Sequence, residues 1–191
     1  VKISVVSATK SAKFTDVGVA YMPYADSIDF LYNCGITTGT STTGSLYNPS
    51  GSVTRGEWIT MLYRAAGSPK MSNKIPFTDV TATNSYSWCY DAVRWAYQNN
   101  ICQGTGATTF SPEMTVSRAQ AMTYLHRSAG LVSSSYYVPF SDVSSDAYYA
   151  PAIRWALSRG ITNGTGANTF SPDEPCTRSQ IVTFLYRAQA V

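Results

Sequence analysis

The clearest pattern of apolar and polar residues is the stretch SVTRGEWITMLYRA, residues 52–65. Four apolar residues recur there at the three- and four-residue spacing that lines one face of an α-helix: Trp58, Met61, Leu62 and Ala65. Thr54 and Glu57 stand just before this face in the Ser/Thr-x-x-Glu/Gln order of a capping box, in which each side chain bonds a backbone amide of the other. We therefore predict an amphipathic helix that begins at Arg55.

The same pattern returns in VSRAQAMTYLHRSA and in CTRSQIVTFLYRAQ, and it predicts helices that begin at Arg118 and Arg178. A cation in the first turn of a helix faces the positive end of the helix dipole, which typically costs about 0.3 to 1 kcal/mol. Because all three helices begin with this unfavourable residue, we expect the three arginines to have a specific role.

Three other motifs accompany the capped helices, also in three copies. Each copy opens with F-S/T-D-V, which contains Asp16, Asp79 and Asp142 at intervals of 63 residues. A helical pattern with one interior aromatic residue follows, at 27–36, 92–101 and 152–161, and the aromatics are Phe30, Trp95 and Trp155. A glycine-threonine loop comes next, with Gly39, Gly104 and Gly164, and ends in an aromatic-x-Pro sequence. Glycine at these positions supplies either a positive φ or a close backbone approach.

The chain is thus three units of helix, loop and helix, at residues 1–67, 68–130 and 131–191. A unit of this size with two apolar helix faces buries too little surface to be stable alone. If each unit contributes its capped helix to a shared centre, the apolar faces cover one another in a three-helix core. We predict one compact, all-α body with pseudo-threefold symmetry.

The motifs F-x-D-V/I, I/V-x-x-G-x-G-x-x-x-F-x-P and V/I-T-R-A/G/S-E/Q, in this order and in three copies between Phe14 and Ala188, resemble the S-layer homology family. The resemblance implies a spindle with a central three-helix bundle and projecting prongs. It also implies an extracellular, wall-attached module that holds exported proteins non-covalently on cell-wall polysaccharide. The sugar that such modules recognise is an acidic amino sugar bearing a pyruvate ketal.

Composition narrows the alternatives. The net charge of +3 is small and the arginines are dispersed, which argues against nucleic acid as a partner. No apolar run approaches the length of a membrane helix, so we expect no membrane insertion. The opening VKISVVSATK lacks the apolar segment of a secretory signal, and we expect a mature or truncated fragment, a monomeric module of a larger exported protein. We expect no cofactor.

The four cysteines show no metal-ligand spacing, and the single His126 lies far from them in the chain. Cys176 occupies the position of Val53 and Val116, which predicts a small, buried apolar side chain. We expect free cysteines, with one disulfide as the alternative in an exported protein, and no metal site.

Arg55, Arg118 and Arg178 have two interpretations. In the first, they pair with Asp16, Asp79 and Asp142 in a structural ring of ion pairs. In the second, each arginine joins the free amides of its helix N-terminus in a pocket for an anion. The family resemblance favours the second interpretation, because a carboxylate on a wall sugar is such an anion.

The other repeated residues also allow a structural and a ligand-binding role. The aspartates form a local turn, accept hydrogen bonds from the sugar, or both. Trp95 and Trp155 belong to the core or line a sugar-binding groove between prongs. Gly39, Gly104 and Gly164 shape the loops or let backbone amides approach the sugar.

The copies are not identical. Only the first has an acid at the capping position, Glu57, where the others have Gln120 and Gln180, so we predict unequal grooves. Glu113, Asp173 and Glu174 are acidic loop residues, but no matched carboxylate pair of the kind used in glycoside hydrolysis recurs in every unit. We therefore expect no enzyme activity. The alternative function is a structural or protein-binding module at the cell surface.

Overall fold

A computed structural model describes residues 11–18 and 22–189 of the chain. The helices in this part are α1 (Met22–Asn33), α2 (Arg55–Ala65), the short 3-10 helix η2 (Ser87–Cys89), α3 (Tyr90–Gln98), α4 (Arg118–Ser128), α5 (Ala150–Ser158) and α6 (Arg178–Gln189). Extended pairing among these residues is limited to isolated bridges, so the predicted all-α class is confirmed. The prediction made for the opening ten residues lies outside the described residues.

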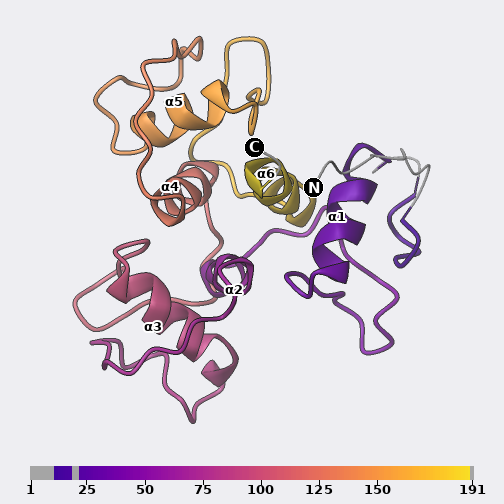
Figure 1. Cartoon of the computed structure of the whole chain (residues 1–191), viewed down its shortest axis with the longest axis vertical. Coiled ribbons are helices and arrows are strands. Elements are labelled where there is room, and N and C mark those ends of the chain that lie inside the picture. Colours follow the sequence, from indigo (N-terminus) through magenta and orange to yellow (C-terminus); the bar gives the residue numbers. More distant parts are fainter. Residues whose placement is uncertain (1–10, 19–21, 190–191) are drawn as a thin grey trace.

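The capped helices α2, α4 and α6 form the centre of the molecule, where Figure 1 shows them nearly end-on, and α1, α3 and α5 lie outside them. The outer helices pair with the central ones as α3 with α2, α5 with α4, and α1 with α6. Each central helix therefore packs against the outer helix of the next copy, and the α1–α6 pair closes the ring. The predicted central bundle with projecting prongs is confirmed.

A closed ring of backbone hydrogen bonds joins the segments that enter the three central helices. Val53 N donates to Cys176 O (2.9 Å), Cys176 N to Val116 O (3.0 Å), and Val116 N to Val53 O (2.9 Å). All three side chains are fully buried, so Cys176 takes the buried apolar position that its alignment with the valines predicts. Because buried backbone groups must be paired, removing any one copy would leave a donor and an acceptor of this ring without partners.

The predicted helix starts are confirmed. In α2 the hydroxyl of Thr54 accepts from Glu57 N at 3.3 Å while the Glu57 carboxylate accepts from Thr54 N at 2.9 Å. Ser117 and Gln120 form the same reciprocal pair at the start of α4, and Thr177 and Gln180 at the start of α6.

The interior aromatic residue of each outer helix packs on the central helix beside it. The ring centroids of Trp95 and Tyr63 are 5.8 Å apart, those of Trp155 and His126 5.1 Å, and those of Phe30 and Tyr186 5.2 Å. Trp95 and Trp155 are only 7% and 4% exposed. Packing between the paired helices therefore explains why each outer helix has an aromatic residue at this position.

All four cysteines are free, and only Cys34 is exposed. Burial raises the pKa of the thiols of Cys89, Cys102 and Cys176 to about 12, so these groups are uncharged at neutral pH. None of the described helices is long and apolar enough to cross a membrane.

Candidate functional site

Each of the three arginines reaches across to the aromatic-x-Pro loop of the next copy. The Nε atoms of Arg55, Arg118 and Arg178 donate to the carbonyls of Phe110 (3.0 Å), Phe170 (2.8 Å) and Tyr47 (2.8 Å), respectively. Each guanidinium also lies over the ring of the same loop residue, with Cζ 4.5 to 4.7 Å from the ring centroid. The three arginine residues are 3 to 5% exposed. One role of the arginines is therefore to fasten neighbouring copies together.

The aspartates hold the same loops from within each copy. Asp16 accepts from the amides of Tyr47 (2.8 Å) and Asn48 (2.7 Å). Asp79 and Asp142 bond the corresponding amide pairs, Phe110 with Ser111 and Phe170 with Ser171. The bonded amides lie 28 to 32 residues beyond the aspartates, so the local turn proposed from the sequence is wrong.

The ring of Arg–Asp ion pairs is also wrong. The two salt bridges in the described part of the chain join Arg94 with Asp91 and Arg178 with Glu57. Arginine and aspartate instead bind opposite faces of one peptide segment: the aspartate takes the N–H groups, and the arginine takes the carbonyl. Both charged motifs thus recur because they hold the same loop.

The amides at the start of each central helix are occupied, contrary to the anion pocket expected from the sequence. In α2, Arg55 N donates to Met114 O (2.8 Å) and Gly56 N to Pro112 O (2.9 Å), both in the next copy. The same pairs of bonds occupy the first amides of α4 and α6. The capping residue accepts a hydrogen bond from the third amide. Of the groups predicted to bind an anion, only the guanidinium groups are therefore available.

A second arginine triplet was missed in the sequence analysis. Arg64, Arg127 and Arg187 follow the first triplet at a constant spacing of nine residues. Their Nη1 atoms donate to the carbonyls of Ile36, Ile101 and Ile161, at 3.2 to 3.3 Å. The constant spacing was the signal that could have identified them.

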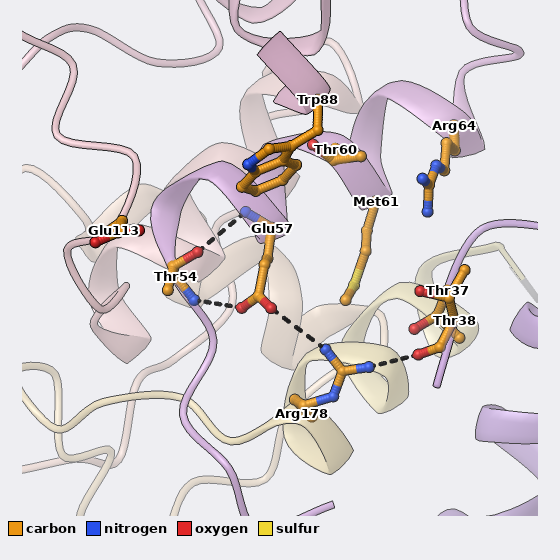
Figure 2. Close-up of a pocket in the computed structure, with 10 residues that line it drawn as sticks. All are labelled: Thr37, Thr38, Thr54, Glu57, Thr60, Met61, Arg64, Trp88, Glu113 and Arg178. Carbon is orange, nitrogen blue, oxygen red and sulfur yellow. Dashed lines mark hydrogen bonds and ion pairs between the residues drawn. The ribbon is translucent and has the colours of Figure 1, made fainter. Parts of the chain in front are cut away.

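A cavity near these arginines lies beside α2 and has a volume of about 620 Å³ (Figure 2). We call it the α2 groove. Its lining residues come from all three copies: Thr37, Thr38, Thr54, Glu57, Thr60, Met61, Arg64, Trp88, Glu113 and Arg178. Arg178 Nη2 donates to Thr38 O (2.7 Å), and Arg178 Nη1 lies 3.7 Å from Glu57 Oε1. Two carboxylates therefore balance the two arginines.

The equivalent cavity beside α6, the α6 groove, has a volume of about 210 Å³. It is lined by Tyr24, Arg118, Thr162, Asn163, Gly164, Gln180, Thr183, Phe184 and Arg187. No acidic residue is among them. Within the described part of the chain Arg118 donates only its Nε–H, to Phe170 O. The α6 groove is thus lined by two cations and by no carboxylate.

The corresponding place beside α4, the α4 site, is defined by Arg55 and by the residues equivalent to those of the α6 groove, Gln103, Gln120, Tyr124 and Arg127. Arg55 Nη1 donates to the Tyr124 hydroxyl, and Nη2 to Gln103 O at 2.8 Å. Burial raises the pKa of Tyr124 to about 12, so its hydroxyl keeps its proton at neutral pH. All three guanidinium nitrogens of Arg55 are engaged with protein groups.

The three loop glycines are needed by close packing. A Cβ at Gly39, Gly104 or Gly164 would lie 2.4 to 2.7 Å from a carbonyl oxygen of its own loop and 2.5 to 3.0 Å from the phenylalanine of F-S/T-D-V. Gly164 also has a φ of +85° and lines the α6 groove. The sequence predicted that glycine supplies either a close backbone approach or a positive φ. All three glycines show the close approach.

The two tryptophans proposed from the sequence do not line either groove, because they are in the helix-pair interfaces. Trp88 lines the α2 groove instead and is 52% exposed. It was missed because the other copies have Pro23 and Tyr148 at this position, so it does not appear in a search for repeated residues.

Fold and site together define a helical module of three linked copies with charged grooves between them. Comparison with known families agrees: residues 76–122 and 139–182 match the S-layer homology domain. These two segments lie in the second and third copies of the chain, so these parts of the chain are S-layer homology domains. The match supports attachment at the cell surface.

Similar stretches occur in proteins with different names. An endoglucanase from Bacillus sp. strain KSM-635 is 39% identical over 117 residues, 61% of this chain and 12% of the endoglucanase. A surface-layer 125 kDa protein from Lysinibacillus sphaericus is 30% identical over 118 residues, 60% of this chain and 10% of that protein. A cell surface protein from Thermoanaerobacter kivui is 30% identical over 118 residues, 59% of this chain and 15% of that protein. The chain thus matches a small part of each.

Proposed function

We propose that this chain anchors an exported protein to the cell wall by binding an acidic polysaccharide, and that the carboxylate of a pyruvate ketal is bound in the α6 groove. The observation that carries the proposal is the charge of this groove, which two arginines line without an acidic residue. The Nη groups of Arg118 make no hydrogen bond within the described residues and suit a carboxylate, which accepts two parallel N–H bonds from a guanidinium.

Burial supports this role for Arg118. Its side chain is 3% exposed, and burial lowers its pKa, yet an arginine remains a cation at neutral pH. A charge that has already lost most of its water binds an anion more strongly than an exposed charge does. Asn163, Gln180 and Thr183 add amide and hydroxyl groups for the rest of the sugar.

Under this proposal the other residues predicted from the sequence support the grooves. Asp16, Asp79 and Asp142 fix the loop backbone that the arginines also hold. Gly39, Gly104 and Gly164 let those loops close, and Trp95 and Trp155 fix the outer helices.

We also propose that the module acts by binding alone, without catalysis. About 60% of this chain is similar to part of an endoglucanase and about 60% to part of a surface-layer protein, and the similar part covers about a tenth of each relative. A segment common to proteins with such different names is more simply explained by attachment than by a shared reaction. Glu113, Asp173 and Glu174 then set groove charge and loop shape.

A sedimentation assay with purified wall polysaccharide tests the proposal. The chain should bind the native polymer, and removal of the pyruvate ketals by mild acid should weaken binding at least about tenfold, the loss expected for one charge-assisted contact of roughly 1.4 kcal/mol. Equal binding to both polymers would contradict the role of the carboxylate. Binding to neither would favour a protein-binding module.

A further inference from the structure

Trp88 is the exposed tryptophan of this chain. Its side chain is 52% exposed, whereas Trp58, Trp95 and Trp155 are 7% exposed or less. Figure 2 shows its indole at the edge of the α2 groove, beside Glu57 and Thr60. A large apolar ring exposed next to a cavity is unfavourable in water, and it suits a partner that covers it.

A glycine found only at this groove, Gly56, leaves room for the indole. A Cβ at Gly56 would lie 3.0 Å from Cη2 of Trp88 and 3.1 Å from Pro112 O. The equivalent positions in the other copies are Ala119 and Ser179, which do have a Cβ. Gly56 therefore allows the ring to lie against the first turn of α2, so that it is positioned without a ligand.

The charges of the α2 groove do not favour an acidic sugar. Glu57 Oε2 accepts from Thr54 N at 2.9 Å, and its other oxygen lies 3.7 Å from Arg178 Nη1. An incoming carboxylate would have to displace Glu57 from Arg178 and would meet Glu113 at the rim. Like charges this close repel each other, which disfavours an anion here relative to the α6 groove.

The remaining lining of the α2 groove includes four threonines, Thr37, Thr38, Thr54 and Thr60. The hydroxyls of Thr37, Thr54 and Thr60 each make one bond within the protein, to Tyr47 Oη, Glu57 N and Gly56 O, and a hydroxyl can make a further bond to a ligand. Hydroxyls and carboxylates hydrogen-bond to sugar hydroxyls, and an aromatic face packs against the C–H face of a sugar ring. A volume of about 620 Å³ is ample for more than one ring.

We propose that the α2 groove is a second glycan site, which binds an uncharged segment of the wall polysaccharide with one sugar ring stacked on Trp88. This inference rests on the proposed function, because it assumes that the module binds a wall glycan. The two grooves then recognise different parts of the same polymer: the α6 groove binds the acidic sugar and the α2 groove binds the neutral residues. Binding at two linked sites raises the overall affinity without new contacts.

Tryptophan fluorescence provides a local test, because Trp88 is the residue that a soluble quencher reaches. Acrylamide quenching of the intact chain would be measured with native polysaccharide and with the same polysaccharide after its ketals are removed. Both polymers should protect Trp88. Trp88→Ala should weaken binding of the ketal-free polymer about tenfold, as loss of one stacked ring does. Tyr137→Ala, at an exposed residue outside both grooves, should leave binding unchanged.

Failure of this inference differs from failure of the proposed function. If native polymer binds in the sedimentation assay while neither polymer protects Trp88, the neutral site is refuted and the acidic site stands. If native polymer protects Trp88 and ketal-free polymer at saturating concentration does not, the α2 groove binds the acidic sugar and the inference is wrong. If no polymer binds at all, the proposed function fails first.

Discussion

The α2 and α6 grooves are built from equivalent residues but differ in charge, because Glu57 and Glu113 line the α2 groove and no acidic residue lines the α6 groove. In both, a threonine and a longer side chain cap the central helix, and an arginine from another copy faces that side chain. The capping residue is Glu57 in one groove and Gln180 in the other, and both accept a hydrogen bond from the cap amide. Because either residue caps the helix, the charge of the groove can change without loss of the helix start.

The three arginines differ in how many of their guanidinium nitrogens donate hydrogen bonds to the protein. Arg55 donates from all three guanidinium nitrogens to protein groups, Arg178 from two while it faces Glu57, and Arg118 from Nε alone within the described residues. One residue type thus serves mainly to link copies at the α4 site and mainly to bind an anion at the α6 groove. A repeated motif identifies equivalent positions, and the local partners decide what each one does.

Replacement of the arginines by alanine should produce the largest effects and should separate these roles. Arg55→Ala removes three hydrogen bonds and leaves the carbonyls of Phe110 and Gln103 without their donors, so we expect a loss of about 3 to 5 kcal/mol in the free energy of unfolding. Arg118→Ala removes one bond and should cost clearly less. Urea denaturation of both variants measures the difference, and equal losses would contradict it.

Exchange of the capping residues should alter binding with little effect on folding. Gln180→Glu places a carboxylate beside Arg118 and should weaken binding of a ketal-bearing sugar about ten- to hundredfold, the effect of an opposed charge worth roughly 1.4 to 2.8 kcal/mol. Glu57→Gln removes the carboxylate facing Arg178 and should create a second anion site. Titration calorimetry with the isolated sugar gives both affinity and stoichiometry.

The matched control is Gln120→Glu at the α4 site, where Arg55 is fully occupied. This variant adds the same charge to an equivalent helix start and should change sugar affinity little. If it weakens binding as much as Gln180→Glu does, the sugar is not bound mainly in the α6 groove.

A smaller effect is expected in the shared centre that supports both grooves. Because burial raises the pKa of Cys176 from about 9 to about 12, the thiol favours the folded state fully below pH 9, and this contribution is lost as pH rises toward 12. Cys176→Val introduces the valine that the other two copies have at this position. Between pH 9 and 12 the unfolding free energy of this variant should fall less than that of the unchanged chain, by at most about 1 kcal/mol per pH unit. Identical pH profiles for both proteins would contradict the buried, neutral thiol.

The sequence was sufficient to predict the parts of the fold that depend on local pattern. Capping residues and apolar spacing located the starts of α2, α4 and α6 correctly, and the repeated motifs predicted three helices at the centre. The helix starts depend on residues a few positions apart, so a single copy already contains them, and the shared centre follows from the presence of three copies.

The partners of the charged residues could not be predicted in this way. Arg55 contacts Phe110 in the next copy, and Asp79 contacts the same residue from within its own copy. A repeat gives the same spacing to every copy and does not say which copy a side chain will reach. The first amides of the helices were expected to be free for the same reason, since their acceptors also lie in another copy.

The grooves themselves were only partly predictable. Arg64, Arg127 and Arg187 recur at fixed spacing and were visible in the sequence, whereas Trp88 has no counterpart and becomes notable only when its exposure and its contact with Gly56 are known. The inequality of the grooves was expected from Glu57, but its effect depends on Arg178, which lies 121 residues away in the chain.

The most direct test of the central claim is an NMR titration that follows the side-chain Nε–H signals of Arg55, Arg118 and Arg178 while a pyruvate-ketal sugar is added. The signals can be assigned with single arginine-to-lysine variants. The account predicts that the Arg118 signal shifts first and saturates at one equivalent of sugar, with Arg55 and Arg178 little changed. A first shift at Arg178 or Arg55, with Arg118 unaffected, would contradict it.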